Sequence, residues 1–187
     1  MHLTNKKENK MAKGITMLLF LFTFVININS QNTMIDKTVV NELDIEKYLG
    51  TWYEIARYDH SFERGLVGVT ADYSFREDGK IKVINSGFKG SLKGPKSTAI
   101  GKAKIPNPKI PSKLKVSFFW IFYADYFVLE LDSDYKWAVI GSKSDKYLWI
   151  LSRSPLMDKE VYNELLNRLT KRGYDVKKLL LVEQKMD

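Results

Sequence analysis

The feature that most constrains this fold is a series of about eight short segments, between residues 50 and 153, in which apolar and polar residues alternate. Alternation with a period of two is the pattern of a β-strand that buries one side and exposes the other. Turn sequences separate the segments, and the clearest, Glu77-Asp78-Gly79-Lys80, is a typical hairpin signal. Many short strands at a spacing of roughly 8–14 residues predict an antiparallel barrel or sandwich.

The period of the pattern changes after the last of these segments. Val161, Leu165 and Leu169 form an apolar stripe with helical spacing, which Asp158 can cap and Gly173 can end. We expect one helix packed on the outside of the β-structure, and a short final strand after it. The expected strands are residues 50–58, 67–76, 80–88, 98–105, 114–120, 126–131, 136–141, 147–153 and 179–183.

The first segment, Gly50–Tyr58, combines a glycine that allows a sharp turn with a strand rich in aromatic residues. Strict alternation places Trp52, Glu54, Ala56 and Tyr58 on one face. A large ring and a small alanine on the same face suit a curved sheet that closes over a cavity. The alternative, which the residues alone leave open, is that Trp52 is a core aromatic in some other β-rich domain.

Composition bounds the remaining possibilities. The chain has 187 residues, 44% of them hydrophobic, which is enough for one folded domain with a sizeable core. Its formal net charge is +8, but both signs are interspersed and no arginine cluster occurs, so nucleic acid is not an expected partner. The sequence contains no cysteine, which excludes disulfides, zinc thiolates, a cysteine nucleophile and a lipid attached through cysteine.

The N-terminal residues have the pattern of an export signal. A lysine-rich head precedes an apolar run at 15–28, which is short for a membrane span but fits the apolar core of a secretory signal. We expect residues 1–30 to be a signal peptide, 31–41 a flexible leader, and 42–187 the folded domain. The protein is then exported, periplasmic or secreted, and carries no lipid anchor on cysteine.

Five separated motifs follow one another between residues 50 and 155. They are Gly50-Thr-Trp-Tyr-Glu-Ile-Ala-Arg57, Phe62-Glu-Arg-Gly65, Val69-Thr-Ala-Asp-Tyr73, Leu114-Lys-Val-Ser-Phe-Phe119 and Tyr147-Leu-Trp-Ile-Leu-Ser-Arg-Ser-Pro155. In this order they resemble the lipocalins, and in particular the branch of bacterial outer-membrane lipocalins and apolipoprotein D-like relatives. The similarity runs from about residue 44 to residue 184. That branch usually carries a lipid-modified cysteine after its signal, and this sequence departs from it there.

The resemblance implies an all-β fold, an eight-stranded antiparallel up-and-down barrel with one C-terminal helix packed outside. It also implies that Gly50, Trp52 and Arg153 form the closed end, with the arginine over the tryptophan ring. Eight strands enclose space for one small ligand. The residues expected to line that space, one face of each strand, are Glu54, Ala56, Tyr58, Tyr73, Val83, Phe118, Trp120, Tyr126, Val128 and Trp149. The inward residues of 136–141 stay open, because Trp137 and Ala138 are both plausible.

An apolar, aromatic pocket with few polar groups suits an amphiphile. The resemblance to the lipocalins implies a carrier of fatty acids, lysophospholipids or similar amphiphiles, in cell-envelope lipid maintenance. The alternative is an enzyme on the same barrel acting on a small hydrophobic substrate. It finds little support, since His60 lies in an expected solvated loop and no serine nucleophile motif accompanies it. We expect no catalytic residue, metal or cofactor. The sequence leaves open a peripheral membrane contact and a homodimer.

Overall fold

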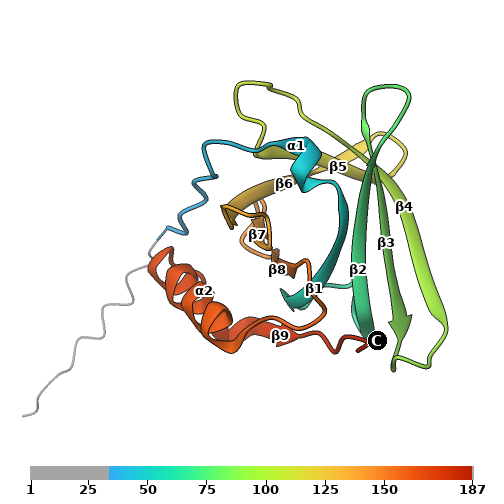
Figure 1. Ribbon diagram of the computed structural model, residues 1–187, viewed down its shortest axis with the longest axis vertical. Helices are drawn as coiled ribbons and strands as arrows, with labels where there is room; N and C mark the ends of the chain where they lie inside the picture. The colour runs from blue at the N-terminus through green and yellow to red at the C-terminus, as the bar shows by residue number, and fades with distance from the viewer. Residues whose placement is uncertain (1–33, 187) are drawn as a thin grey trace, which may run out of the picture. The chain divides into compact units, whose positions relative to one another are not determined.

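The structure, a computed structural model, describes residues 34–186 of the chain. The expected signal peptide at 1–30 lies outside the described residues. The described part is an eight-stranded antiparallel β-barrel with a helix against its outer surface (Figure 1). Its strands are β1 (Gly50–Tyr58), β2 (Leu66–Phe75), β3 (Ile81–Lys89), β4 (Lys96–Lys104), β5 (Lys113–Phe119), β6 (Phe122–Leu131), β7 (Trp137–Gly141) and β8 (Leu148–Ser152).

The barrel closes because β1 pairs with strands at both ends of the sheet. Its first half, from Gly50 to Tyr53, pairs with β2, and residues from Tyr53 to Arg57 pair with β8. Neighbours in sequence pair in between, from β2 to β8, so the barrel is of the expected up-and-down kind. A ninth strand, β9 (Leu179–Leu181), pairs with the last residues of β1, beyond the part of β1 that pairs with β2.

A β-bulge divides β1 and changes which residues face the interior. The register against β8 shifts between Glu54 and Ala56, so alternation is broken there. Ala56 and Tyr58 belong to the buried cluster beneath the helix, and the Tyr58 hydroxyl donates to the Asp175 carbonyl, 3.0 Å away. These two residues therefore leave the face that strict alternation gave them.

The C-terminal helix α2 (Lys159–Lys171) packs on the outside of the barrel, as expected (Figure 1). Asp158 caps its N-terminus, and Leu165 and Leu169 bury the apolar stripe against strands β6–β8. The same packing shows which residues of β7 point into the barrel. Trp137 contacts the helix-side cluster, whereas Ala138 belongs to the cluster inside the barrel.

Two short helices complete the fold: α1 (Ile45–Tyr48) before β1 and the 3-10 helix η1 (Val176–Lys178) before β9. Among residues 34–186 no helix has the length and apolarity needed to cross a membrane.

The segment before α1 departs from the expectation of a flexible leader at 31–41. In its described part, the Val40 backbone N–H donates to the Val128 carbonyl and the Val40 carbonyl accepts from the Ser112 hydroxyl. Arg172, at the end of α2, donates to the Thr38 carbonyl at 2.9 Å. These bonds hold residues 36–40 along the barrel wall.

Candidate functional site

One end of the barrel is closed by Trp52 and Arg153. The guanidinium carbon of Arg153 lies 3.9 Å from the centre of the Trp52 ring, a cation–π contact. Arg153 also donates to the carbonyls of Lys47, Leu49 and Thr51, each at 2.8 Å. Gly50 has a φ of 88°, so the chain turns from α1 into β1 in a conformation that favours glycine. Gly50, Trp52 and Arg153 are the residues expected at the closed end, and the structure places them next to one another.

Three tyrosines lie above the closed end and form the floor of the interior. The hydroxyl of Tyr126 is 2.6 Å from that of Tyr48 and 2.9 Å from that of Tyr73. Burial raises the pKa of all three hydroxyls, so they remain neutral donors and acceptors. This satisfied network gives the interior a rigid polar floor.

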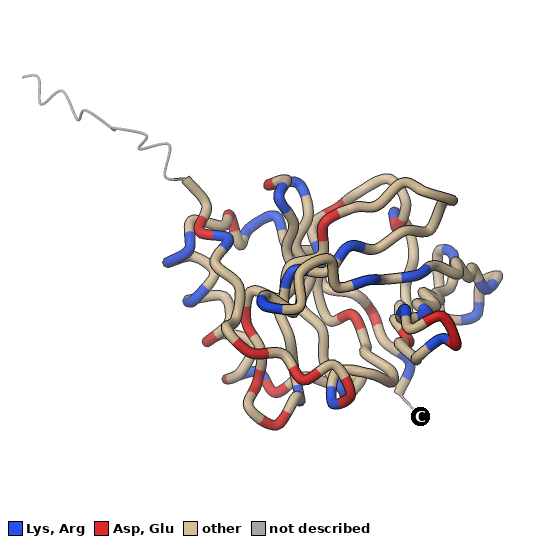
Figure 2. Tube along the Cα trace, turned by 90° about the horizontal axis from the view of Figure 1, so that it is seen from above, with Lys and Arg blue, Asp and Glu red and all other residues tan. Residues whose placement is uncertain are grey.

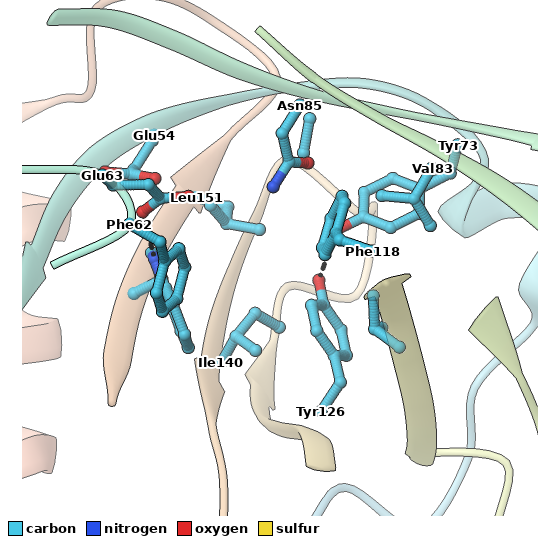
Figure 3. Close-up of a pocket in the computed structure, with 13 residues that line it drawn as sticks. Glu54, Phe62, Glu63, Tyr73, Val83, Asn85, Phe118, Tyr126, Ile140 and Leu151 are labelled. Carbon is cyan, nitrogen blue, oxygen red and sulfur yellow. Dashed lines mark hydrogen bonds between the residues drawn. The ribbon is translucent and has the colours of Figure 1, made fainter. Parts of the chain in front are cut away.

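Two adjoining cavities occupy the barrel above this floor. The inner cavity has a volume of about 70 Å³ and the outer one about 320 Å³. They share Phe62, Glu63, Asn85, Val116 and Phe118 as lining residues, so they form one passage toward the loops that join β1 to β2 and β5 to β6. Figure 3 shows the inner part, where aromatic and aliphatic side chains predominate and a polar group stands on one side.

The polar group is a buried cluster built on β1, β8 and the loop between β1 and β2. Arg57 pairs with Glu54 at 2.6 Å, across the bulge that turns both side chains inward. Glu63 accepts from the indole N–H of Trp149 at 3.1 Å, and its Oε2 atom is 3.0 Å from Nε2 of His60. Figure 3 shows the two carboxyl groups side by side.

The two carboxyl groups differ in ionisation. Burial raises the pKa of Glu54 well above its usual range, and the Glu63 charge raises it further, while Arg57 partly offsets both. Burial also opposes ionisation of Glu63, but contacts with His60 and Trp149 and the charge of Arg57 outweigh it and lower its pKa. The local contacts therefore favour the proton on Glu54 and the negative charge on Glu63, close to the positive charge of Arg57.

His60 is not the solvated loop residue that the sequence suggested. It is buried, stacked on Phe62 with ring centres 3.9 Å apart, and lies 5.2 Å from the Trp149 ring. The loop at 59–65 folds back over the barrel mouth because Arg57 donates to the carbonyls of Glu63 and Leu66. Within residues 34–186 no three His, Asp or Glu side chains are grouped so as to hold a metal ion.

The structure brings together on the inner wall six of the ten residues expected to line the pocket. These are Glu54, Tyr73, Val83, Phe118, Tyr126 and Trp149.

The other four lie elsewhere. Ala56 and Tyr58 face α2 because of the bulge in β1, which alternation alone cannot reveal. Trp120 is at the tip of the β5–β6 hairpin and is 81% exposed, because β5 ends at Phe119. Val128 is fully buried in the cluster inside the barrel and lines neither cavity.

Sequence reasoning missed the rest of the inner lining, for three reasons. Ile140 lies in the segment 136–141, whose inward face the sequence left open. Phe62 and Glu63 come from a loop, where no periodicity marks an inward residue. Ala71, Asn85, Val116 and Leu151 could have been found, since each is two residues from an expected lining residue on the same strand.

Comparison with known proteins agrees with this architecture. A family model for a lipocalin-like domain matches residues 43–184. The outer membrane lipoprotein Blc of Escherichia coli is 48% identical over 147 residues, covering 79% of this chain and 82% of the relative. Apolipoprotein D of Mus musculus is 34% identical over 185 residues, covering 91% and 96%. Insecticyanin from the tobacco hornworm Manduca sexta has the same fold, with a TM-score of 0.65 at 24% identity over 80% of this chain and 85% of that one.

Proposed function

The chain belongs to the lipocalin family, and from this premise we propose that it binds single-chain amphiphiles, such as fatty acids or lysophospholipids, in its barrel. The observation that carries the proposal is the passage between the closed end and the mouth, lined mainly by apolar and aromatic side chains. Such a site suits a ligand whose binding rests on burial of hydrocarbon.

The narrowness of the passage supports one acyl chain over a bulky ligand. The outer cavity, at about 320 Å³, is at the small end of the range for ligand pockets, and the inner cavity has room for only about two water molecules. A single chain can enter such a space end first and stop at the tyrosine floor. Two acyl chains or a fused ring system need more volume than the two cavities offer.

The polar cluster supports a neutral or zwitterionic headgroup. The two terminal nitrogens of Arg57 already donate to Glu54 and to two backbone carbonyls, which leaves only its Nε–H for a ligand carboxylate. Glu63 remains negative at the point where both cavities meet, and it repels a bare fatty carboxylate there. We therefore favour lysophosphatidylethanolamine-like lipids over free fatty acids.

We further propose a role outside the cytoplasm, in carrying or storing envelope lipids. Two relatives, from Escherichia coli and Vibrio cholerae, are named outer membrane lipoproteins, which supports export. The 187 residues contain no cysteine, so attachment of a lipid through cysteine is not available to them. Basic and acidic residues are both scattered over the described trace (Figure 2), which does not favour nucleic acid.

A non-enzymatic role fits the chemistry of the wall. The Glu54 carboxyl is engaged by Arg57, and Glu63 by His60 and Trp149, so neither is free to move a proton on a ligand.

Native mass spectrometry of protein purified from its own host tests the proposal. We expect one lysophospholipid-sized ligand per chain, lost on organic extraction, and a protein mass that corresponds to cleavage near residue 30 without an acyl group. Protein that carries no lipid after gentle purification, and takes up none when lysophospholipid is added back, would contradict the carrier function.

A further inference from the structure

The tip of the β5–β6 hairpin, residues 118–122, exposes a continuous run of large apolar side chains. Phe119, Trp120, Ile121 and Phe122 are 73%, 81%, 72% and 70% exposed. Single exposed hydrophobic residues are common on soluble proteins, but four in succession at one point form a contiguous apolar patch that calls for a partner. The ring stacking of Phe119 on Phe122, at 6.5 Å, holds the hairpin tip in shape.

The backbone gives a second reason to attribute a role to the hairpin tip. Trp120 has a φ of 52°, in the left-handed region that bulky residues rarely adopt. Glycine or asparagine would form this turn at lower conformational cost. A tryptophan in that position contributes nothing to the core, so its strained backbone points to a role for the side chain outside the fold.

The surroundings of the hairpin tip are basic. Trp120 shares a shallow depression on the outer wall with Arg76 and Lys102. The ammonium groups of Lys102 and Lys104 lie 5.9 and 4.4 Å from the centre of the Tyr123 ring, next to the hairpin tip. Lys115, on the same hairpin, pairs with Asp125 at 2.7 Å, and Arg76 pairs with Asp78 at 2.9 Å, so the positive charge left beside the hairpin tip is that of Lys102 and Lys104. The charge next to the patch therefore complements an anionic surface.

The hairpin tip is also the rim of the ligand passage. Phe119 and Phe122 line the outer cavity, together with Phe62, which is itself 60% exposed. A surface that covers the hairpin tip would therefore lie directly at the opening through which an amphiphile enters.

We propose that the hairpin tip inserts into the headgroup region of an anionic phospholipid bilayer, with Lys102 and Lys104 at the lipid phosphates. Tryptophan and phenylalanine partition to this depth, and lysines near the surface add attraction to anionic lipids. A second copy of the chain fits less well, because a two-fold contact through the same patch would bring the lysines of both copies together. The contact needs no covalent lipid, and it is independent of whether the passage is occupied.

Co-sedimentation with phosphatidylcholine vesicles, with and without phosphatidylglycerol, tests the membrane contact on protein purified from its host. The informative variant is Trp120→Gly, which removes the ring and relieves the strained backbone, so the fold is retained. We expect roughly tenfold weaker binding for Trp120→Gly, and likewise for Ile121→Ser, which leaves the backbone unchanged. The matched control is Leu156→Ser, which removes a 66% exposed leucine at the closed end and leaves binding unchanged.

Vesicles with and without anionic lipid separate the contribution of the two lysines from that of the apolar side chains. Lys102→Gln/Lys104→Gln should weaken binding to vesicles with phosphatidylglycerol and have no effect on phosphatidylcholine alone. Vesicle binding that is unchanged in Trp120→Gly and Ile121→Ser would overturn the proposal. So would sedimentation that shows a dimer of the native protein that Trp120→Gly dissociates, because the patch would then belong to a second copy. Lysophospholipid titrations of Trp120→Gly in solution keep the two proposals apart, since the variant should retain ligand binding.

Discussion

At the scale of single residues, the buried pair of Glu54 and Glu63 most clearly departs from ordinary surface chemistry. Two carboxyl groups so close cannot both ionise easily, and the local contacts decide which one keeps the proton. His60, Trp149 and Arg57 favour the charged form of Glu63, so the proton stays on Glu54. Alternation predicted that Glu54 lies on the inner wall of the barrel. It could not predict the contact with Arg57, because the two side chains meet only through the bulge.

The raised pKa of Glu54 predicts a specific pH dependence of stability. A carboxyl group whose pKa is higher in the folded than in the unfolded protein stabilises the folded state at low pH. This stabilisation is complete below the pKa in the unfolded protein, about 4.3, and is lost as the pH rises through the pKa in the folded protein. Glu54→Gln, a neutral mimic, lacks this slope. In urea unfolding between about pH 5 and pH 8, the free energy of unfolding of the native protein should therefore fall relative to that of Glu54→Gln.

The control for this series is Glu77→Gln, an exposed glutamate in the β2–β3 turn. Its stability should stay parallel to that of the native protein across the same pH range. A free energy of unfolding of the native protein that stays parallel to that of Glu54→Gln between about pH 5 and pH 8, or rises relative to it, would contradict the raised pKa of Glu54.

At the scale of elements, the closed end depends on Arg153. Arg153 directly follows β8 in the chain. Its guanidinium donates to carbonyls at the end of α1 and the start of β1, so it connects the three elements. The resemblance to lipocalins predicted the contact with Trp52, whereas the three backbone acceptors come from residues about a hundred positions away and carry no sequence signal.

Arg153→Ala should lower stability and spare ligand binding. It uncovers the Trp52 ring and leaves three carbonyls without a donor, a loss of about 1–3 kcal/mol. The cavity is lined by other residues, so lysophospholipid affinity at low temperature should be unchanged. Thermal melts beside lipid titrations measure both quantities, with Arg153→Lys as the variant that keeps the charge but not the fork of donors. A variant with an unchanged melting temperature that cannot bind would make Arg153 a ligand contact instead.

Strand boundaries and strand faces differ in how well sequence predicts them. The period of two predicted the bounds of β1 closely, and the helical period predicted those of α2, because burial on one side imposes a regular pattern on each. Alternation failed wherever the backbone departs from regularity. The bulge reversed Ala56 and Tyr58, and the aromatic run at 118–123, which does not alternate, hid the start of β6 at Phe122.

Small residues on β4 illustrate a further limit. Ala99 lines the outer cavity, where its small side chain leaves room. Gly101 does not leave room: a Cβ there would lie 2.6 Å from the Ser117 carbonyl and 2.7 Å from the Phe118 ring. A glycine can mark an empty space or a close approach, and sequence does not distinguish the two.

At the scale of the whole described domain, the account rests on one passage that ends at a rigid floor. Strand count, helix and family were predictable from the sequence, because a barrel imposes its pattern on every strand. The loop at 59–65 was not, although it supplies Phe62 and Glu63 to the wall, since long-range contacts alone determine its path.

The most direct test is the affinity of a lysophospholipid series that differs only in acyl chain length, measured by calorimetry. Each buried methylene contributes about 0.8 kcal/mol, so affinity should rise about fourfold per methylene and then level off when the chain reaches the tyrosine floor. Ala99→Trp narrows the outer cavity and should weaken every member, whereas Ile100→Trp, its outward-facing neighbour on β4, should not. An affinity that ignores chain length, or that Ala99→Trp leaves unchanged, would contradict binding in the barrel.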